Sequence, residues 1–517
     1  MTLQEKAASL SQDDIIALLQ SNQELTQQLS WLKQQLFGAK SERRILTTTD
    51  SRQTTLGEQL AQALAQEAPR ESVQSYTRRT QGSAPPNEDE PAPRFDESVP
   101  VEIIRVPNPE IADLSLDSYD IIGEKETLRL AQKPCSYVVL KYIRQVVKLK
   151  KSARFSCPPA PASVLEKCLA DASFIACMLI EKFVYFQPLY RQHQRMLANG
   201  IRIDRSVLTK WTHASILQLL PIFEALVSSV VESSLVIMDE TPVSAGRTKR
   251  APPKPGKMKK GYFWPIYGDK DEIVFPFSPS RAHTNVTKFL GPSFTGKLLS
   301  DGYAAYDAYA AQMEGLVHAC CWSHTRRHFI NAEQAEPQLV QKAIEFIGAM
   351  YGHEETIRNQ KLEGEKKLEY RAMHCKPIVE AFFAWLEGVS QEALLLPSSP
   401  FTKAASYALN RQKQLRVFLE YPDVPVDTNQ VEREIRPIAL GRRNWLFAWT
   451  EVGAKYVGII HSLIATCKLQ GVDPYTYLVD VLQRVHTHPA RDVHLLTPRL
   501  WKKHFANQIM RSDLDSA

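Results

Sequence analysis

The fold of this protein is decided by the stretch Ser234-Leu235-Val236-Ile237-Met238-Asp239-Glu240-Thr241-Pro242. Five small or apolar residues precede two acids and a turn. Periodicity alone does not separate such a run from a buried helix, but its shortness and the proline at its end favour a strand. The stretch therefore predicts a short buried strand that ends in a carboxylate.

Two further acids stand in comparable settings. Asp301 follows a candidate strand, Lys297-Leu298-Leu299-Ser300, and Glu432 follows a helix-capping group, Asp427-Thr428-Asn429, so that it projects from the first turns of a helix. Mg²⁺ prefers oxygen ligands, and paired Mg²⁺ ions can activate the attacking oxygen and stabilise the leaving oxygen in nucleotidyl transfer. We expect Asp239, Asp301 and Glu432 to meet and hold divalent metal, although spacing alone leaves Glu434 as an alternative to Glu432.

The length, net charge and cysteine content of the chain restrict the class of protein. A chain of 517 residues can bury several cores, with a prior of about three domains. Its net charge of +6 is compatible with a nucleic-acid partner without requiring one. Eight cysteines without a C-x-x-C pair, and no signal peptide, indicate reduced thiols in the cytoplasm. No apolar run approaches the ~20 residues of a membrane span.

The N-terminal part divides into two segments. Residues 1–44 contain a heptad whose a positions include Asn22, a polar insertion that fixes register and favours two strands. We expect a dimerising coiled coil there; one amphipathic helix packed on the same chain is the alternative. Residues 45–100 are rich in Thr, Gln, Ser and Pro and predict a flexible linker.

Two small modules follow. Residues 101–157 contain the β-rich run Tyr137–Val147 and predict a small β-module. Residues 158–230 predict helices, one at about 164–182 and two more around a turn at Asn199-Gly200, the last with an N-cap at Asp204 or Ser206. This pattern is typical of a helix-turn-helix DNA-binding segment and also of an ordinary helical hairpin.

The remaining chain predicts an α/β core. Residues 231–330 contain candidate strands at 235–238, 262–267, 273–277 and 297–300 and a further apolar stretch at 316–321. We expect a helical insertion at 331–420, the remainder of the core with Glu432 at 421–450, and a helical C-terminal region at 451–517.

A basic loop lies between the first two candidate strands. Its cations are accompanied by no acid, and they are Arg247, Lys249, Arg250, Lys254, Lys257, Lys259 and Lys260. Such a run is usually a solvated loop. Beside Asp239, however, it is well placed to bind DNA phosphates.

The motifs, taken together, carry a family resemblance. They are Met238-Asp239-Glu240-Thr241-Pro242-Val243, Phe277-Ser278-Pro279-Ser280-Arg281, Ser300-Asp301-Gly302-Tyr303-Ala304-Ala305-Tyr306, Cys321-Trp322-Ser323-His324-Thr325-Arg326-Arg327-His328-Phe329, Asp427–Pro437, Gly441–Phe447 and Ile464–Pro474. In this order they resemble the DDE transposases of the bacterial insertion-sequence family sixty-six and cover most of 163–490. Tyr190-Arg191-Gln192 resembles that family's helical DNA-binding segment, and the heptad ending in Leu36-Phe37-Gly38 resembles its leucine-zipper start.

The resemblance implies a ribonuclease-H-like mixed-sheet catalytic core with a helical insertion. It implies that Asp239, Asp301 and Glu432, rather than Glu434, bind Mg²⁺, with Mn²⁺ as an alternative. Metal-activated water would cleave at the element end, and the freed 3′-hydroxyl would attack target DNA. The implied partners are element and target DNA, a second copy of the chain through the coiled coil, and small accessory proteins, in a bacterial cytoplasm.

Several other residues have two interpretations each. His324 orients a phosphate or a metal-bound water, or is simply hydrogen-bonded beneath a helix. Asn429 is a cap or supports the metal ligands. Arg326 and Arg327 contact DNA phosphate or are solvated, and the same alternatives apply to Arg442 and Arg443.

One feature departs from the family pattern. Relatives usually carry a zinc module with paired cysteines, whereas Cys135 and Cys157 stand alone here and no histidine precedes His193. Four nitrogen or sulfur ligands are therefore lacking locally, and we expect no structural zinc. This departure supports an alternative, a decayed or domesticated DNA-binding protein, whereas the presence of all three acids favours the enzyme.

Overall fold

A computed structural model describes residues 94–95, 99–112, 114–115, 118–133, 136–150, 154–166, 168–247, 258–391, 396–445, 448 and 450–515. All of them fall within one compact unit, Pro93–Ala517. The coiled coil predicted for 1–44 and almost all of the predicted linker 45–100 lie outside the described residues.

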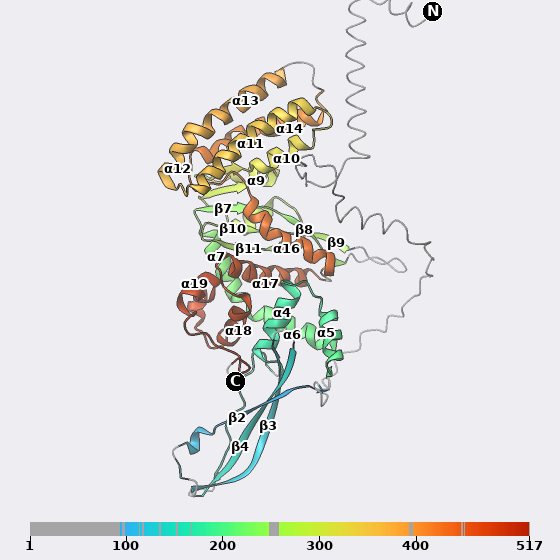
Figure 1. The fold of residues 1–517 in the computed structure, drawn as a ribbon, viewed down its shortest axis with the longest axis vertical. Helices are drawn as coiled ribbons and strands as arrows, with labels where there is room; N and C mark the ends of the chain where they lie inside the picture. Colours follow the sequence, from blue (N-terminus) through green and yellow to red (C-terminus); the bar gives the residue numbers. More distant parts are fainter. Residues whose placement is uncertain are drawn as a thin grey trace, which may run out of the picture. The chain divides into compact units, whose positions relative to one another are not determined.

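A five-stranded mixed sheet carries the two predicted aspartates (Figure 1). Its strands lie in the order β11-β10-β7-β13-β14. β7, β13 and β14 run parallel, and β10 pairs antiparallel with β7 and β11. The bounds are β7 Leu235–Met238, β10 Ile266–Gly268, β11 Glu272–Val274, β13 Lys297–Ser300 and β14 Val317–Cys320; the short helices α8 Thr284–Leu290 and α9 Ala304–Ala310 precede and follow β13.

The central strand β7 is the one that the opening stretch predicts, and all of its residues are buried. Strands covered on both faces are expected to be continuously apolar. β7 and β13 are parallel neighbours, with Ile237 opposite Leu299. Asp239 and Asp301 therefore leave the sheet at the same edge. The strands predicted at 235–238, 297–300 and within 316–321 are confirmed.

The strands predicted at 262–267 and 273–277 are only partly right, because each divides between two sheets. The divisions fall at Pro265 and Pro276, which have no N–H to donate to a ladder. Their carbonyls accept hydrogen bonds from Asp239 N (3.4 Å) and Trp264 N (2.9 Å), respectively. The separated pieces join a second, three-stranded sheet in the order β12-β9-β8, with bounds β8 Thr241–Arg247, β9 Met258–Phe263 and β12 Phe277–Ser278.

Helix α17 (Glu451–Leu469) covers the edge strand β11 (Figure 1). The N–H of Ile273 donates to Thr466 Oγ1 (3.1 Å) and the N–H of Phe275 to Ser462 Oγ (2.8 Å). These bonds satisfy backbone groups that an edge strand otherwise exposes. The segment 470–473 separates α17 from the next helix. The remaining C-terminal elements are α18 Pro474–Arg484, the 3₁₀ turn Ala490–Leu496 and α19 Pro498–His504.

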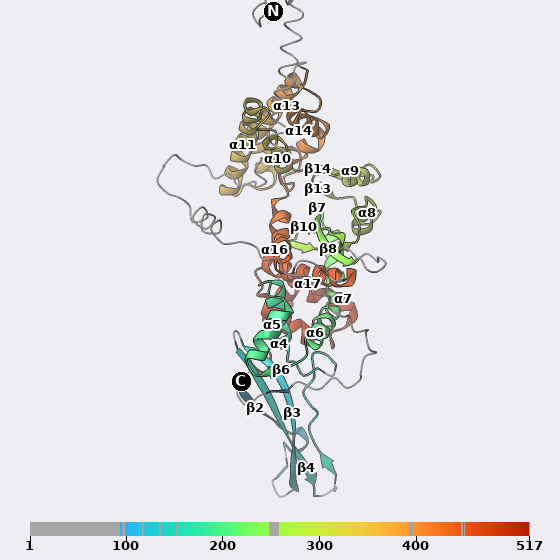
Figure 2. The same ribbon diagram turned by 90° about the vertical axis from the view of Figure 1, so that its right-hand side faces the viewer.

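Long strands form the region that the β-rich run predicts, and Figure 2 shows them alongside one another. β4 pairs antiparallel with β3 and parallel with β2. Leu514, from near the end of the sequence, packs into the small core of this sheet, and the Tyr142 hydroxyl donates to Asp513 (2.7 Å). The bounds are β2 Val101–Val106, β3 Tyr119–Lys133, β4 Ser136–Leu149 and β5 Phe155–Ser156, with a 3₁₀ turn at Pro109–Ile111.

The helical segment that follows starts later than predicted. α4 (Ala172–Phe183) begins at Ala172 rather than near 164, because Asp171 caps it by accepting from Ser173 N (2.8 Å). The turn at Asn199-Gly200 is present, with Gly200 at φ 78°. The other elements are α5 Leu189–Ala198, α6 Arg205–Gln218, α7 Leu220–Val231 and the pair β1 Arg94–Phe95 with β6 Ile201–Arg202. Within the described ranges no single helix is long and apolar enough to cross a membrane, and only α6 with α7, bent by 44°, meet that criterion together.

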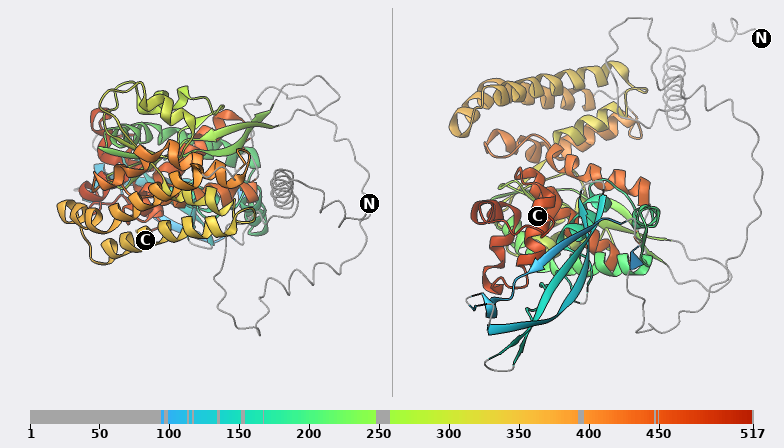
Figure 3. Two further views of the ribbon diagram at one scale, coloured as in Figure 1. Left: turned by 90° about the horizontal axis from the view of Figure 1, so that it is seen from above. Right: turned by 60° about the horizontal axis from the view of Figure 1, so that its bottom comes forward.

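The predicted insertion is a block of packed helices, in which α13 contacts both α11 and α14 (Figure 3). Near the end of the block the helix α14 stops at Arg411, whose backbone leaves the helical region (φ −116°, ψ 17°). The bounds are α10 Trp322–Ile330, α11 Pro337–Asn359, α12 Gly364–Tyr370, a π-turn Arg371–Cys375, α13 Lys376–Gln391, α14 Pro400–Asn410, α15 Gln412–Arg416 and a 3₁₀ turn Val417–Leu419; α16, Asn429–Trp445, follows the block.

Candidate metal centre

Three carboxylates meet where β7 and β13 end. One oxygen from each of Asp239, Glu240 and Asp301 lies within 4.8 Å of the other two. Asp239 Oδ1 accepts from the N–H of Glu240 (2.7 Å), and Asp301 Oδ1 accepts from the N–H of Tyr303 (2.9 Å). The two aspartates that the strand pattern predicts are therefore brought together, and Glu240 joins them.

The environment of Asp239 disfavours its negative charge. Burial raises the pKa of Asp239 to about 7, and the neighbouring carboxylates of Asp301 and Glu240 add to the shift. Like charges so close together raise each other's cost of ionisation. A cation among these side chains would reverse that cost.

Glu240 is the site residue that the sequence left without a role. Its side chain is 2% exposed. Oε1 accepts from Nε of Arg281 (2.7 Å) and also from its Nη2, and Oε2 accepts from the hydroxyl of Tyr306 (2.9 Å). Burial and the charge of Asp301 raise the pKa of Glu240, and Arg281 opposes that shift. Arg281 and Tyr306 both stand in motifs that carry the family resemblance, which is the signal that could have drawn attention to them.

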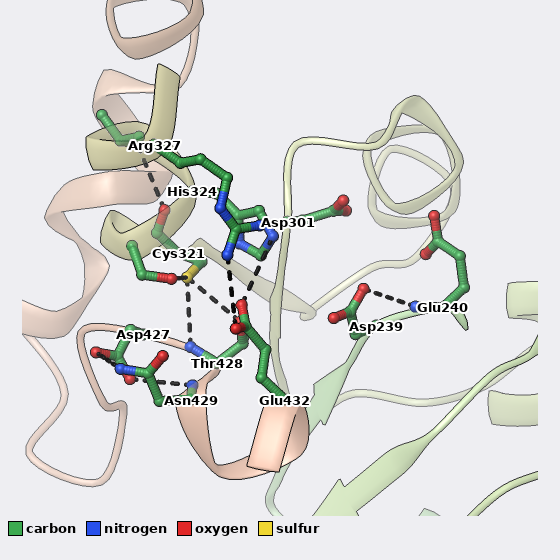
Figure 4. Close-up of polar contacts among 12 residues, drawn as sticks. Asp239, Glu240, Asp301, Cys321, His324, Arg327, Asp427, Thr428, Asn429 and Glu432 are labelled. Carbon is green, nitrogen blue, oxygen red and sulfur yellow. Dashed lines mark hydrogen bonds and ion pairs between the residues drawn. The ribbon is translucent and has the colours of Figure 1, made fainter. Parts of the chain in front are cut away.

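Glu432 lies in the first turn of α16, as its capping group predicts. It does not belong to the three-carboxylate group. Its carboxylate faces two basic side chains of α10, with Oε1 3.8 Å from His324 Nε2 and Oε2 3.6 Å from Arg327 Nη2 (Figure 4). Among the described residues Oε1 has no hydrogen-bond partner although it is buried.

His324 interacts both with the aspartates of the three-carboxylate group and with Glu432. Burial opposes the charged form of His324, but the Cys321 thiol and the carboxylates of Asp239 and Asp301 outweigh it and raise the pKa of His324 to about 9. The same ring faces Glu432. His324 therefore interacts electrostatically with the Asp239–Asp301 pair as well as with Glu432.

Cys321, which the sequence did not single out, holds α16 against α10. Its Sγ accepts from the N–H (3.3 Å) and the hydroxyl (3.4 Å) of Thr428, and its own N–H donates to the Ser300 carbonyl (3.0 Å). Ser300 immediately precedes Asp301. One buried residue thus links the strand that carries Asp301, the helix that carries His324 and the helix that carries Glu432.

Asn429 interacts with its neighbour rather than with the acids. Its N–H donates to Asp427 Oδ1 (3.1 Å) and its Nδ2 to Asp427 Oδ2 (2.6 Å). The accepting side chain at the start of α16 is thus Asp427, and Asn429, the first residue of the helix, is the residue that it caps.

The cations predicted to contact DNA have different surroundings. Lys249, Arg250, Lys254 and Lys257 lie outside the described residues, and Arg247 ends β8. Lys259 is exposed and pairs with Glu451 (3.1 Å), and Lys260 is exposed over the Tyr262 ring. Arg326 and Arg443 are exposed. Arg442 is half-buried and donates to the Pro242 carbonyl, and Arg327 faces Glu432.

The donor set fits a hard divalent cation. Such ions bind through carboxylate oxygens, and these are supplied here by neighbouring acids. Burial first, and then the charges of Asp301 and Glu240, raise the pKa of Asp239, and the buried Glu432 Oε1 is an acceptor without a hydrogen-bond donor among the described residues. Asp239, Glu240 and Asp301 supply converging oxygens of this kind, and Glu432 lies outside that group.

Comparisons with known proteins find relatives by sequence and by structure. The curated relatives include two described as "Uncharacterized protein y4qI" and "Uncharacterized protein y4jD", both from Sinorhizobium fredii (strain NBRC 101917 / NGR234). Each is 28% identical to this chain; the first match covers 92% of this chain and 88% of the relative, and the second 93% and 94%. A solved structure, "Drosophila P element transposase strand transfer complex", is 10% identical with a TM-score of 0.31, covering 60% of this chain and 93% of that one.

Family models match three parts of the sequence. "IS66 C-terminal element" matches residues 462–498, and "Transposase C of IS166 homeodomain" matches 24–104. "Transposase IS66 family" matches residues 167–456, which include Asp239, Asp301 and Glu432. Because that match covers more than half of the sequence, the chain belongs to the transposase IS66 family.

Proposed function

We propose that this transposase cleaves DNA strands at the ends of a bacterial insertion sequence and joins them to target DNA, with Mg²⁺ or Mn²⁺ bound by Asp239, Asp301 and Glu432. The observation that carries the proposal is the convergence of Asp239 and Asp301 at adjacent parallel strand ends, with oxygens within 4.8 Å. The family membership supplies the substrate class, DNA. The catalytic chemistry is our inference from the carboxylates.

We further propose that the five-stranded sheet is the ribonuclease-H-like core that the resemblance implies. Its mixed strand directions and the helical block between β14 and α16 support this assignment. The block separates Glu432 from Asp301 in sequence, while Cys321 and Thr428 hold the start of α16 near β13. A fold of this kind can place three distant acids at one site.

The side chains have separable roles in this proposal. When bound, divalent metal supplies an activated oxygen nucleophile and stabilises the leaving oxygen. Asp239 and Asp301 bind it from the sheet, and Glu432 does so from α16. His324 and Arg327 hold Glu432 beside the pair. Exposed Lys259, Lys260, Arg326 and Arg443 are suited to DNA phosphates, together with the cations of the basic loop.

We also propose that residues 1–44 dimerise the protein as a coiled coil. The heptad with Asn22 at an a position supports this arrangement. Removing residues 1–44 should change the protein from a dimer to a monomer, so that the mass of the particle in solution, measured by light scattering, falls to that of one shortened chain. An unchanged oligomer after the deletion would rule the coil out as the dimerising element.

The catalytic proposal is tested by strand cleavage on DNA carrying the ends of the element, with Mg²⁺ and any small companion proteins encoded beside the gene. The wild type should cleave, and Asp301→Asn should not. Asp269→Asn is the matched control, because Asp269 lies near the start of β7, where it accepts from Ser234 N (2.8 Å), away from the carboxylate edge. If the complete mixture shows no metal-dependent cleavage by the wild type, the enzyme hypothesis is wrong and the DNA-binding alternative remains.

A further inference from the structure

We propose that Glu240 is a third carboxylate of the Asp239–Asp301 cation site and that Arg281 and Tyr306 position it there. The inference rests on the proposed function, because it assigns a residue to the metal site of that function. It concerns a side chain that neither the strand pattern nor the family triad assigns.

Geometry places Glu240 closer to the two aspartates than Glu432 is. The ligand atoms of Asp239, Glu240 and Asp301 are mutually within 4.8 Å, whereas Glu432 is not part of that group. Each carboxylate oxygen has two lone-pair sites. The contacts from Arg281 and Tyr306 therefore leave acceptor capacity on Glu240 for a cation or for its bound water.

The fixed orientation of Glu240 has a defined cause. Two nitrogens of Arg281 donate to Oε1, and the hydroxyl of Tyr306, in helix α9, donates to Oε2. The guanidinium of Arg281 stacks on the ring of Tyr303 at 4.0 Å, and the Tyr303 hydroxyl donates to the Arg281 carbonyl (2.6 Å). The N–H of Tyr303 in turn donates to Asp301. Arg281 thus positions Glu240 and is tied to the loop that carries Asp301.

The balance of charges around the three carboxylates shows that the Arg281–Glu240 ion pair alone does not explain why Glu240 is buried there. Among the described residues Arg281 is the one cation hydrogen-bonded to any of the three carboxylates. This guanidinium and the imidazolium of His324, whose pKa Asp239 and Asp301 help to raise to about 9, are therefore two cations facing three buried or half-buried acids. A buried carboxylate whose role is only structural is better matched one to one, since unpaired buried charge is costly.

The same sheet supplies such a one-to-one pair for comparison. Glu272 in β11 accepts from Arg499 Nε (2.8 Å) on one oxygen and from the Ser229 hydroxyl (2.6 Å) on the other. Its side chain is fully buried, and no other acid joins it in a potential metal-binding group of described residues. Glu272 therefore has the same kind of partners as Glu240 without the two aspartates.

The test measures Mn²⁺ binding to the metal-free, full-length protein by isothermal titration calorimetry, with thermal unfolding of each variant as the measure of folding. The variants are Glu240→Gln and Arg281→Lys, with Glu272→Gln as the matched control and Asp301→Asn as the reference for the aspartate pair. We expect Glu240→Gln to weaken binding about 10–100-fold, in the range found when groups that support a metal site are removed. Arg281→Lys should also weaken Mn²⁺ binding, because the two-nitrogen contact to Glu240 is lost. Its effect should be smaller than that of Glu240→Gln, because the positive charge remains.

The control variant should lower the melting temperature while leaving Mn²⁺ affinity unchanged. If Glu240→Gln does not fold, Glu240→Asp, which keeps the charge and shortens the side chain, is measured in its place. Binding by the Glu240 variant equal to that of the wild type, together with loss of binding in Asp301→Asn, would overturn this inference and leave the proposed function standing. A wild type that binds no Mn²⁺ would overturn both.

Discussion

The acids at the edge of the sheet are held together at a cost to stability in the metal-free protein. Asp239, Glu240 and Asp301 have oxygens within 4.8 Å of each other, and the pKa of Asp239 is raised to about 7, first by burial and then by its neighbours. Folding alone does not need such repulsion. Sites that must bind a cation commonly retain strain of this kind.

Asp301→Asn should therefore stabilise the metal-free protein at pH 8. Removing one charge relieves the repulsion on Asp239, and each ~1 kcal/mol gained corresponds to a rise of about 2–4 °C in the melting temperature of a domain of roughly 150–250 residues. Differential scanning calorimetry in the presence of a chelator measures this change. Asp269→Asn, away from the site, should bring no gain, and a lower melting temperature for Asp301→Asn would contradict the repulsion argument.

His461 predicts a loss of stability in mild acid. It is buried in α17 beside Phe275, and burial lowers its pKa from the ordinary 6.5 to about 4. Between these values the unfolded chain binds a proton that the folded chain does not, so the free energy of unfolding falls as the pH drops from about 6.5 towards 4. From pH 7 to pH 5 the contribution is about 2 kcal/mol.

Urea unfolding at the two pH values, for the wild type and His461→Gln, measures how much His461 contributes to the pH dependence of the free energy of unfolding. The variant should lose about 2 kcal/mol less than the wild type over the same interval. Equal losses in both proteins would show that His461 does not cause the pH dependence.

At this scale the sequence predicts some contacts and not others. Asp239 and Asp301 follow from strand ends, and the position of Glu432 follows from its helix cap, because both signals are local. The partners of Glu240 are 41 and 66 residues away, so no local pattern could reveal them. The thiol of Cys321 likewise acquires its role from Thr428, 107 residues later.

Elements meet closely where α17 crosses the edge of the sheet. A Cβ on Gly458 would lie 2.3 Å from the backbone oxygen of Phe275. Ser462 and Thr466, one and two turns further on, make the hydrogen bonds that cover β11. The helix can supply those hydroxyls only at this short distance.

Gly458→Ala should cost about 3 kcal/mol, the upper part of the usual range for overpacking, because backbone rather than a mobile side chain blocks the methyl group. Gly348→Ala in α11 is the matched control, since nothing lies within 4 Å of its Cβ position. The control should gain roughly 0.5–1 kcal/mol from helix propensity. Urea unfolding of both variants gives the comparison, and similar effects of the two substitutions would refute the close approach.

The joint between α10 and α16 gives a prediction of its own. Cys321→Ala removes the acceptor of the Thr428 N–H and hydroxyl, and the unpaired buried donors should cost about 1–3 kcal/mol. Cys321→Ser keeps an acceptor and should lose less. The two variants are compared by chemical unfolding, and a serine variant no better than alanine would show that packing of the sulfur, not hydrogen bonding, holds the joint.

The limits of sequence interpretation at the level of elements also have physical causes. Strand β7 is predictable because its burial makes it apolar throughout, and β13 because its centre, Leu298-Leu299, is buried and apolar. The sequence does not reveal the divisions at Pro265 and Pro276, because apolar runs that belong to two different sheets follow one another without a visible break. The late start of α4 depends on a cap at Asp171, and an apolar run before it conceals that boundary.

Across the whole molecule, single polar residues join distant segments. Arg371 in the helical block is fully buried and donates to both oxygens of Glu354 (2.7 and 2.9 Å) and to the carbonyls of Phe418 (2.6 Å) and Val424 (3.1 Å). Val424 belongs to the segment that leads to α16. The block is thereby attached to the approach to Glu432.

The small sheet of β2, β3 and β4 is joined to the far end of the sequence in the same way, since Tyr142 and Asp513 are 371 residues apart. During translation, at about 5–20 residues per second, roughly 20–75 seconds separate the two as they leave the peptidyl-transferase centre. For that interval the nascent sheet lacks the cover that Leu514 gives to Leu140 and Tyr142. Products whose synthesis stops short of residue 512 would keep this apolar surface uncovered, so that only chains translated beyond that point acquire a finished sheet.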